Sequence, residues 1–484
     1  MASQLNLLRN SRVFFTTNLL SDNTIANGVA CTTTNTQELT ILDNFSFSQS
    51  NNNDVVTVSE AGTTPARGQR SFNTSLNPVD FSFSTYIRPY VSGTVKADES
   101  HLWNALFGTV PLSTTATTIG SVPTTASVTN AGVLTLIGTG FPVLSVGGIY
   151  VVKGVIGQTA NQFNSAIKVS ASSATTLTAQ YIVAPKNNVN FTTASVVAGT
   201  AFALTSWNEN AAVIADTQIG TTAYSELTTA RSNVNTLLPF GIIVSLDNVT
   251  YAIDNCALDQ ASIDFGLDGI ATVQWTGKAT ALRALAYTTI TGAVFSGSLT
   301  GTFSPKSSVA TTRYITNKLS TVTLAANIGG GGTSYNVPLT GGSIQIANNI
   351  QYVTPSNLGV VNTPVGYYTG TRAITGSLNA YLRTGNTGSQ SNTAVLLSDM
   401  LSSAATVIEP EYQLGIQIGG SSNPTRIEVL ANGASLQIPT IDAQAVISTV
   451  INFTVQGADA SQGTAATNFD IEATNDLNIR YFSN

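Results

Sequence analysis

The chain has 484 residues, with 19 Lys and Arg, 25 Asp and Glu and a single His, and its formal net charge is −6. Charged residues make up only 9% of it, against about 25% in an ordinary soluble domain, and this scarcity excludes a charge-driven disordered chain. The acidic balance also argues against a nucleic-acid-binding protein that neutralises phosphates with a basic patch.

The hydrophobic segments are short. A membrane-spanning helix needs about 20 consecutive apolar residues, and the longest candidate, 141–156, is interrupted by Pro142 and Lys153. The first residues lack the basic and then apolar pattern of a secretory signal, so we expect assembly in the cytoplasm of the producing cell. Cys31 and Cys256 form neither a disulfide framework nor a metal spacing. We expect free, buried thiols.

Apolar and polar residues alternate with a period of two along most of the chain, which predicts β-strands. In chain order, examples are 44–49, 81–84, 273–275, 344–346 and 416–418. Clusters of Gly and Asn separate these runs, as turns require. Helical spacing is confined to 101–107 and 394–401. We predict an all-β fold of two tandem β-sandwich or barrel domains, each with one short helix.

The two helical segments belong to an internal repeat. The stretch 82–88 matches 377–383 at an offset of 295 residues, and the same offset places Leu102 on Leu397. One offset therefore aligns both the predicted strand and the predicted helix of the first copy with those of the second. Self-similarity of this kind is the sequence signature of a duplicated structural unit.

The first copy contains an insertion. A later match, 241–244 with 415–418, has an offset of only 174 residues, so the two offsets differ by 121. The extra stretch is rich in Thr, Ala, Ser, Val and Gly, and we expect a small β domain on the surface. The predicted domains are a discontinuous first domain at 1–110 and 237–300, an inserted β-rich decoration domain at 111–236, and a second domain at 301–484.

Three polar residues are candidates for a catalytic or metal-binding role. His101 is the single imidazole, and it opens a short helix, where a helix-terminal polar residue is the better interpretation. Asp264 and Asp268 resemble half a calcium loop, but apolar residues occupy the alternate positions that must supply ligands. We expect a turn between two strands there.

Other candidate sites are equally weak. Glu409 and Glu411 flank a proline, which favours a solvated or interface-facing loop over a catalytic pair. The glycines at 329–332 have no following Lys and helix, so they predict a flexible hairpin-like connection and no phosphate-binding loop. Arg67 and Arg70 fit a salt bridge between subunits better than a nucleic-acid site. We therefore predict no enzyme, no cofactor and no metal.

An acidic, duplicated β scaffold with few charges fits symmetric self-association. Three two-copy chains make a ring of six pseudo-equivalent positions. One alternative is a self-assembling β-rich surface, adhesin or envelope-layer protein, which predicts an export signal. Another is a glycan-active enzyme, which needs two carboxylates in an aromatic-lined groove; the chain has only three tryptophans, Trp103, Trp207 and Trp275.

Several segments, in the right order, resemble the tail tube proteins of long-tailed bacteriophages, in particular the duplicated, trimer-forming type of T-five-type siphophages. The segments are 35–39, 58–62, 67–78, 81–90, 254–261, 269–277, 314–319, 339–344, 348–355 and 375–378. The resemblance covers about 5–110 and 237–484 and leaves out the insertion. The chain ends after 479–482 without the immunoglobulin-like domain that some relatives append, so we expect outer decoration from the insertion.

This resemblance implies a structural virion protein of the phage tail. The expected assembly is a homotrimeric, pseudo-hexameric ring that stacks into a hollow tube, with an inner barrel closed across subunits. Expected partners are other copies of the chain, the tape measure protein, the tail tip or baseplate and the tail terminator. Genomic DNA is expected to pass through without specific binding, and no membrane insertion is expected.

The long loops of the two copies, 58–75 and 354–370, are the candidate contacts to the adjacent ring. Within them we single out Arg67, Arg70, Pro355 and Asn357 as candidate inter-ring residues. On this hypothesis, deletion of 63–70 yields soluble rings that do not stack, and intact tubes from the deletion would refute it.

Overall fold

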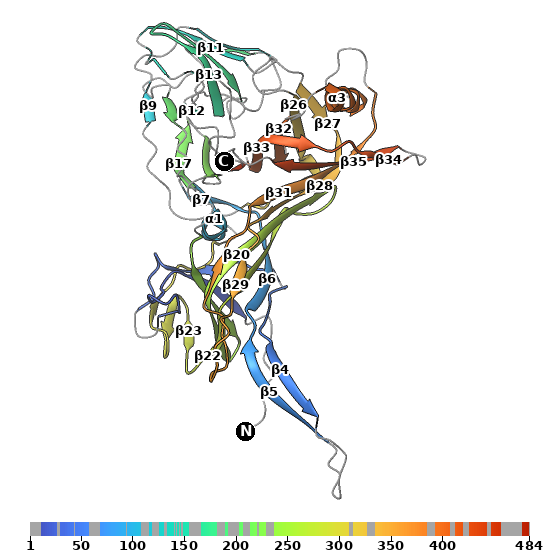
Figure 1. Cartoon of the computed structure of the whole chain (residues 1–484). Helices are drawn as coiled ribbons and strands as arrows, with labels where there is room; N and C mark the ends of the chain where they lie inside the picture. The colour runs from blue at the N-terminus through green and yellow to red at the C-terminus, as the bar shows by residue number, and fades with distance from the viewer. Residues whose placement is uncertain are drawn as a thin grey trace, which may run out of the picture.

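The structure, a computed structural model, is β-rich throughout (Figure 1). It describes residues 11–26, 30–42, 44–57, 68–92, 94–107, 116–118, 125–129, 133–139, 141, 143–144, 146, 149–153, 166–181, 189–191, 203–206, 213–219, 222–228, 237–308, 313–326, 334–384, 393–406, 412–419, 425–442, 447–455 and 477–483. These residues include two α-helices, α1 (Ser100–Phe107) and α3 (Thr393–Thr406), at the predicted places. The all-β prediction is confirmed. No helix of this described part is long and apolar enough to cross a membrane.

The first half of the chain supplies the strands drawn in the lower part of Figure 1. They are β1 (Arg12–Thr16), β2 (Thr36–Leu39), β3 (Ser46–Ser48), β6 (Val79–Tyr86), β19 (Phe240–Leu246), β20 (Val249–Gly266), β21 (Thr272–Ala279) and β22 (Ala281–Leu285). Smaller pieces are the hairpin β7 (Pro89–Ser92)–β8 (Thr94–Ala97) and the sheet β23 (Thr289–Thr291), β24 (Val294–Ser296) and β25 (Gly301–Thr302).

The second half supplies a similar set of strands. Its elements are the 3-10 turn η3 (Asn317–Leu319), β26 (Thr321–Ala326), β27 (Ser334–Val337), β28 (Leu339–Ala347), β31 (Ala373–Tyr381), β32 (Tyr412–Ile418), β33 (Arg426–Leu436), β34 (Thr440–Asp442), β35 (Ser448–Val455) and β36 (Leu477–Ser483). Antiparallel pairs correspond between the halves: β6–β21 with β31–β35, β1–β19 with β26–β32, and β3–β6 with β28–β31. This correspondence supports the predicted duplication, which stays an inference.

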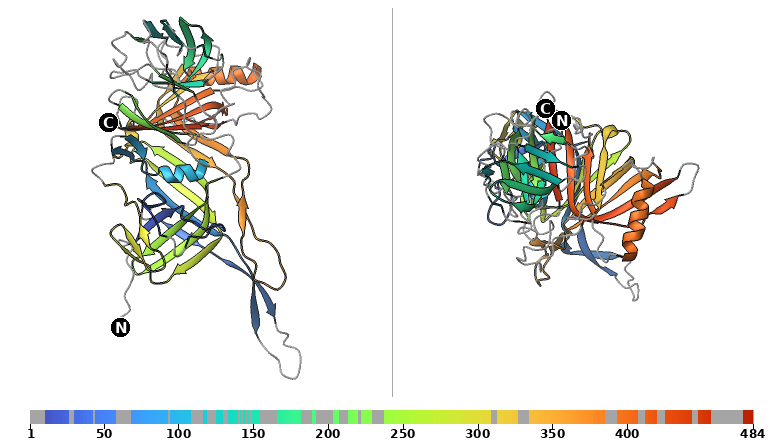
Figure 2. Two further views of the ribbon diagram at one scale, coloured as in Figure 1. Left: turned by 90° about the vertical axis from the view of Figure 1, so that its left-hand side faces the viewer. Right: turned by 90° about the horizontal axis from the view of Figure 1, so that it is seen from above.

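The two halves are joined through one strand pair. β20 runs antiparallel to β21 on one side and, over its last third, to β28 on the other, so that Ile263 lies opposite Ile344. Strands of both halves thereby extend a single sheet. α1 lies across one face of this sheet and covers it, as the left view of Figure 2 shows.

That covered face holds the main hydrophobic core. Trp103 of α1 packs edge-on against Trp275 of β21 with ring centroids 4.7 Å apart. Both indoles are satisfied: Trp103 Nε1 donates to the Tyr481 hydroxyl at 2.8 Å, and Trp275 Nε1 donates to Thr85 Oγ1 at 2.9 Å. Buried Trp residues that also find hydrogen-bond partners fix the position of an element as well as stabilising it.

Glycines face aromatic rings across three strand pairs of the sheet: Gly277 with Phe81, Gly342 with Phe265, and Gly376 with Phe453. In each pair the ring covers the missing side chain, as in the aromatic rescue of sheet glycines. An added Cβ at Gly277 lies 2.3 Å from Phe81 Cζ and 2.6 Å from the Ala257 carbonyl oxygen. The space above each glycine is therefore filled.

We predict that Gly277→Ala destabilises the fold by about 1–3 kcal/mol, because overpacking forces the ring and the neighbouring backbone apart. Gly366→Ala is the matched control, since no heavy atom lies within 4 Å of its added Cβ. The measurement is the urea midpoint of each variant. Equal midpoints for the two alanine variants would contradict the prediction.

The stretch between the two parts of the first half forms a separate sheet, at the top of Figure 1. Its order is β15 (Val189–Phe191), β10 (Thr125–Val128), β11 (Val133–Ile137), β14 (Thr176–Tyr181), β13 (Ala166–Ser172), β12 (Ile149–Lys153), β16 (Ala203–Ser206) and β9 (Ala116–Thr118). The next hairpin, β17 (Val213–Ile219)–β18 (Thr222–Thr228), pairs with β36 instead. The end of the predicted insertion thus contacts the strands of the second half.

Candidate functional site

The face of the main sheet that points away from the core is polar and almost uncharged. Strand alternation places one side chain per strand in a row across β6, β21, β20, β28, β31 and β35. One such row, read from the strand registers, is Ser84, Gln274, Ser262, Gln345, Thr375 and Thr454. A parallel row begins at Thr272 and continues through Asp264, Ser343, Ser377 and Asn452.

Charges on this polar face are few. Asp80 of β6 and Lys278 of β21 lie opposite each other and form an ion pair with Nζ 2.8 Å from Oδ1. Asp264 is exposed. A hydroxyl- and amide-lined surface without a row of cations gives a phosphate backbone nothing to bind tightly, because phosphate affinity depends on Lys and Arg.

Two hairpins project from the same end of the sheet, one from each half. They are β4 (Asn51–Thr57)–β5 (Gln69–Leu76) and β29 (Gln351–Val353)–β30 (Gly366–Tyr368). Both point the same way in the left view of Figure 2. The loop of the second hairpin is tied to β5, because Leu76 N donates to the Asn362 carbonyl at 2.8 Å and Asn362 N donates to the Thr74 carbonyl at 3.1 Å.

The projecting hairpins carry an unusual number of exposed apolar side chains. Leu358 is fully exposed, and the others are Val55, Val56, Phe72, Val360, Val361 and Val365, each about half exposed or more. We call these seven residues the apolar tip. Exposed apolar side chains that gather on protruding hairpins are typical of a protein-protein contact. The loops were predicted from the sequence but the apolar tip was not, and its one local signal is the run 358–361 (Leu-Gly-Val-Val).

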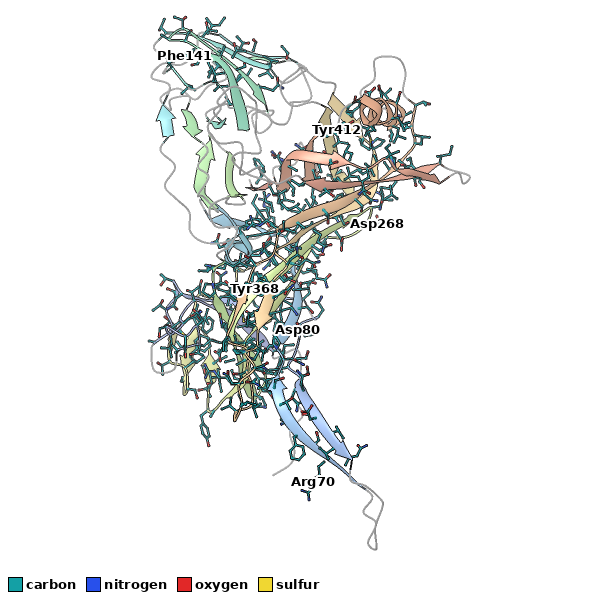
Figure 3. All side chains as sticks on the ribbon, viewed as in Figure 1. Arg70, Asp80, Phe141, Asp268, Tyr368 and Tyr412 are labelled. Atoms are coloured by element: carbon teal, nitrogen blue, oxygen red, sulfur yellow. The ribbon has the colours of Figure 1, made fainter. Side chains whose placement is uncertain are left out.

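Three of the four predicted inter-ring residues, Arg70, Pro355 and Asn357, lie on or beside these hairpins. Arg70 is exposed on β5 opposite Val56, near the end of the described part of the hairpin (Figure 3). Pro355 is half-buried and Asn357 is exposed, both between β29 and β30, and Asn357 N donates to Asn362 Oδ1 at 2.8 Å. Arg67 lies outside the described residues. Their part in ring contacts stays a prediction.

Of the remaining candidate residues, His101 and Asp268 lie in the described part of the chain. His101 lies on α1 with its ring 5.6 Å from that of Phe15. Asp268 is 96% exposed in the turn after β20, as expected. Glu409, Glu411 and the glycines 329–332 lie outside the described residues.

The described residues offer no metal-binding cluster and no disulfide. No group of three or more potential metal ligands occurs in the described part of the chain. Cys31 and Cys256 are both buried and free, which confirms the expectation for the thiols.

An acidic cluster unites the two chain halves beside α1. Tyr481 of β36 donates its hydroxyl proton to Glu99, the residue before α1, and Asp98 forms an ion pair with Arg88. Complete burial raises the pKa of Glu99 from 4.5 to about 8, and the neighbouring Asp98 adds to the increase. Glu99 is therefore a neutral acid in the folded chain at pH 7.

This raised pKa predicts a pH dependence of stability. Between about pH 4.5 and 8 the folded chain holds a proton on Glu99 that the unfolded chain has lost, so stability falls as pH rises through this window. The slope from this group is about 1.4 kcal/mol per pH unit. We predict that Glu99→Gln, which stays neutral, flattens the dependence of the urea midpoint between pH 5.5 and 7.5. An unchanged slope would contradict the assignment.

Comparison with known proteins finds a similarity that covers nearly the whole chain. The chain is 26% identical over 464 residues to the "Tail tube protein pb6" of Escherichia phage T5, and the alignment covers 95% of this chain and 74% of that protein. No protein-family model matches the chain. The similarity confirms the resemblance to tail tube proteins of T-five-type phages. Because it covers 95% of the chain, it also extends into 111–236, which the segment-by-segment resemblance left out.

Proposed function

We propose that the chain is the major tail tube subunit of a long-tailed bacteriophage, a structural virion protein that self-assembles into a hollow tube. The similarity to the tail tube protein of phage T5 over nearly the whole chain supports this role. A passive conduit needs no catalytic group, so the role is structural and non-enzymatic.

The observation that carries the proposal is the single sheet to which both halves contribute, with one face buried under α1 and the other polar and nearly uncharged. Such a sheet suits the wall of a channel for DNA. Its hydroxyls and amides hydrate the lumen, while the scarcity of Lys and Arg avoids the salt-dependent phosphate binding that would hold the genome in place.

Each chain contributes two similar units to the wall, so three chains form a ring with six pseudo-equivalent positions. The two units of one chain need not be identical, because the threefold symmetry of such a ring relates whole chains and not the two units within a chain. The decoration sheet of β9–β16 then lies outside the channel. The partition into domains at 1–110 with 237–300, 111–236 and 301–484 belongs to the same proposal.

The apolar tip supports stacking of rings. It lies at one end of the strands, so its partner is the opposite end of the next ring, and a head-to-tail contact of this kind continues into an open filament. Arg70, Pro355 and Asn357 accompany the apolar tip in this contact. The ends of the tube are completed by the tail tip or baseplate and the tail terminator, the tape measure protein fills the lumen before infection, and genomic DNA passes through transiently.

Negative-stain electron microscopy of the purified protein at rising concentration tests this function. Hollow rods with a regular axial repeat are expected. Flat sheets would instead favour an envelope-layer protein and would contradict the tube.

A further inference from the structure

In the part of the chain that the structure describes, two strands of the main sheet, β3 and β34, are each paired on one side only, whereas the corresponding strands of the other half are paired on both sides. β20 and β28 are each paired on both sides, with one another and with β21 and β31 respectively. Their counterparts in the other half, β34 and β3, each show a single ladder among the described strands, β34 with β35 and β3 with β6. An unpaired strand edge offers its N–H and C=O groups to another chain.

The counterpart of β34 is the last third of β20. Ser262–Ile263–Asp264 and Thr440–Ile441–Asp442 have nearly the same sequence, and both run antiparallel to the start of the next strand, β21 and β35. A matched hydrogen bond fixes the alignment. Ile87 N donates to the Ala271 carbonyl just before β21, and Leu382 N donates to the Ile447 carbonyl just before β35, both at 2.9 Å.

The counterpart of β3 is the middle of β28. In the first half the hydroxyls of Ser46 and Ser82 are 2.8 Å apart, and in the second half those of Ser343 and Ser377 are 3.1 Å apart. Ser82 and Ser377 are the residues that the internal repeat superimposes. Ser46 therefore corresponds to Ser343, and the next residue, Phe47, corresponds to Ile344.

Both halves also show a shift in strand register beyond the serine pair, and the residues on the far side of the shift correspond as well. Beyond the serine pair, Ile41 lies opposite Thr85 in the first half, and Leu339 lies opposite Ala380 in the second. Thr85 and Ala380 are again related by the offset of 295. The correspondence thus holds on both sides of the irregularity.

From these correspondences we propose that β34 of one chain pairs antiparallel with β3 of a second copy, in the register of the β20–β28 junction. Within the chain, Ser262 lies opposite Gln345, Ile263 opposite Ile344 and Asp264 opposite Ser343. Transferred to the two edges, Thr440 lies opposite Ser48, Ile441 opposite Phe47 and Asp442 opposite Ser46 of the neighbouring copy.

Side-chain chemistry agrees with this register. Ile263 and Ile344 are both 1% exposed where they meet inside the chain. The proposed equivalent pair, Ile441 and Phe47, is also apolar, and Ile438, just before β34, is 55% exposed in the single chain. A second copy laid along this edge covers that apolar surface. The six paired residues include no Pro, Lys or Arg, the residues that proteins use to block edge pairing.

The contact joins two different edges, so it is heterologous and propagates until it closes. Each chain already contains one such junction internally. Three copies therefore give three internal and three intermolecular junctions around one ring. The number of copies rests on the proposed tail tube function, whereas the register is derived from this chain alone.

Disulfide cross-linking tests the register. Ser48→Cys with Thr440→Cys places two thiols directly opposite, where Cβ atoms of neighbouring strands lie within disulfide range. Ser46→Cys with Thr440→Cys is the control on the same face, two residues out of register. After oxidation, denaturing gels are expected to show covalent dimers and trimers for the first variant and at least tenfold less for the control. Equal or reversed yields would overturn the register.

Hydrogen exchange of the unmodified protein provides a second measurement that does not depend on folding of the variants. Amides of 46–48 and 440–442 are expected to be at least tenfold more protected in assembled material than in monomers. Tubes whose two segments exchange as in the monomer would refute the strand pairing and leave the tail tube function standing. Cross-linked closed trimers that never form hollow tubes would support the pairing and contradict the function.

Discussion

A chain carrying Leu358→Asp and Val360→Asp is expected to form rings that do not stack. Both side chains belong to the apolar tip, and Leu358 is fully exposed in the single chain. In the proposed tube they are buried against the next ring. A carboxylate forced into an apolar contact without a partner costs several kcal/mol, and each ring has three such tips, so tube yield should fall about 100-fold or more.

The control is Val143→Asp, at an exposed valine next to the decoration sheet. Sedimentation separates rings from tubes, and electron microscopy identifies them. Rings without tubes for the double variant, together with normal tubes for the control, are the expected result. Normal tubes from the double variant would show that the apolar tip takes no part in the inter-ring contact.

A chain carrying Gln274→Lys and Gln345→Lys is expected to assemble normally and to retain DNA. The two glutamines lie in the same row of the polar face, on β21 and β28. Three chains then place six ammonium groups around one level of the lumen. About six phosphate contacts make affinity fall roughly 10³-fold between 50 and 200 mM salt.

The measurement is binding of double-stranded DNA fragments to open-ended tubes at these two salt concentrations. The unsubstituted tube and the matched variant Gln274→Glu with Gln345→Glu are expected to bind no DNA at either. If the lysine variant also fails to bind DNA, the polar face does not line the channel.

Local pattern was enough to predict the strands and helices of this fold. The alternation in 81–84 predicted β6, and the helical spacing after Ser100 predicted α1. Each of these signals lies within a few residues of chain, where side-chain periodicity and backbone geometry are directly linked.

Long-range contacts were not predictable in the same way. The Glu99–Tyr481 hydrogen bond joins residues 382 positions apart, and the pairing of β18 with β36 brings the end of the predicted insertion to the end of the second half. A single sequence carries no signal for such pairings, because the residues involved are ordinary strand and cap residues. The apolar tip was missed for a related reason: the sequence predicted long loops at 58–75 and 354–370, but the exposure of their apolar side chains depends on the tertiary structure.

Cryo-electron microscopy of tubes assembled from the purified chain tests the central claim most directly. The account predicts a hollow tube of stacked trimers with six similar units around each ring and with Gln274, Ser262 and Gln345 facing the lumen. A map in which α1 faces the channel, or in which the chain assembles only into flat sheets, would contradict it.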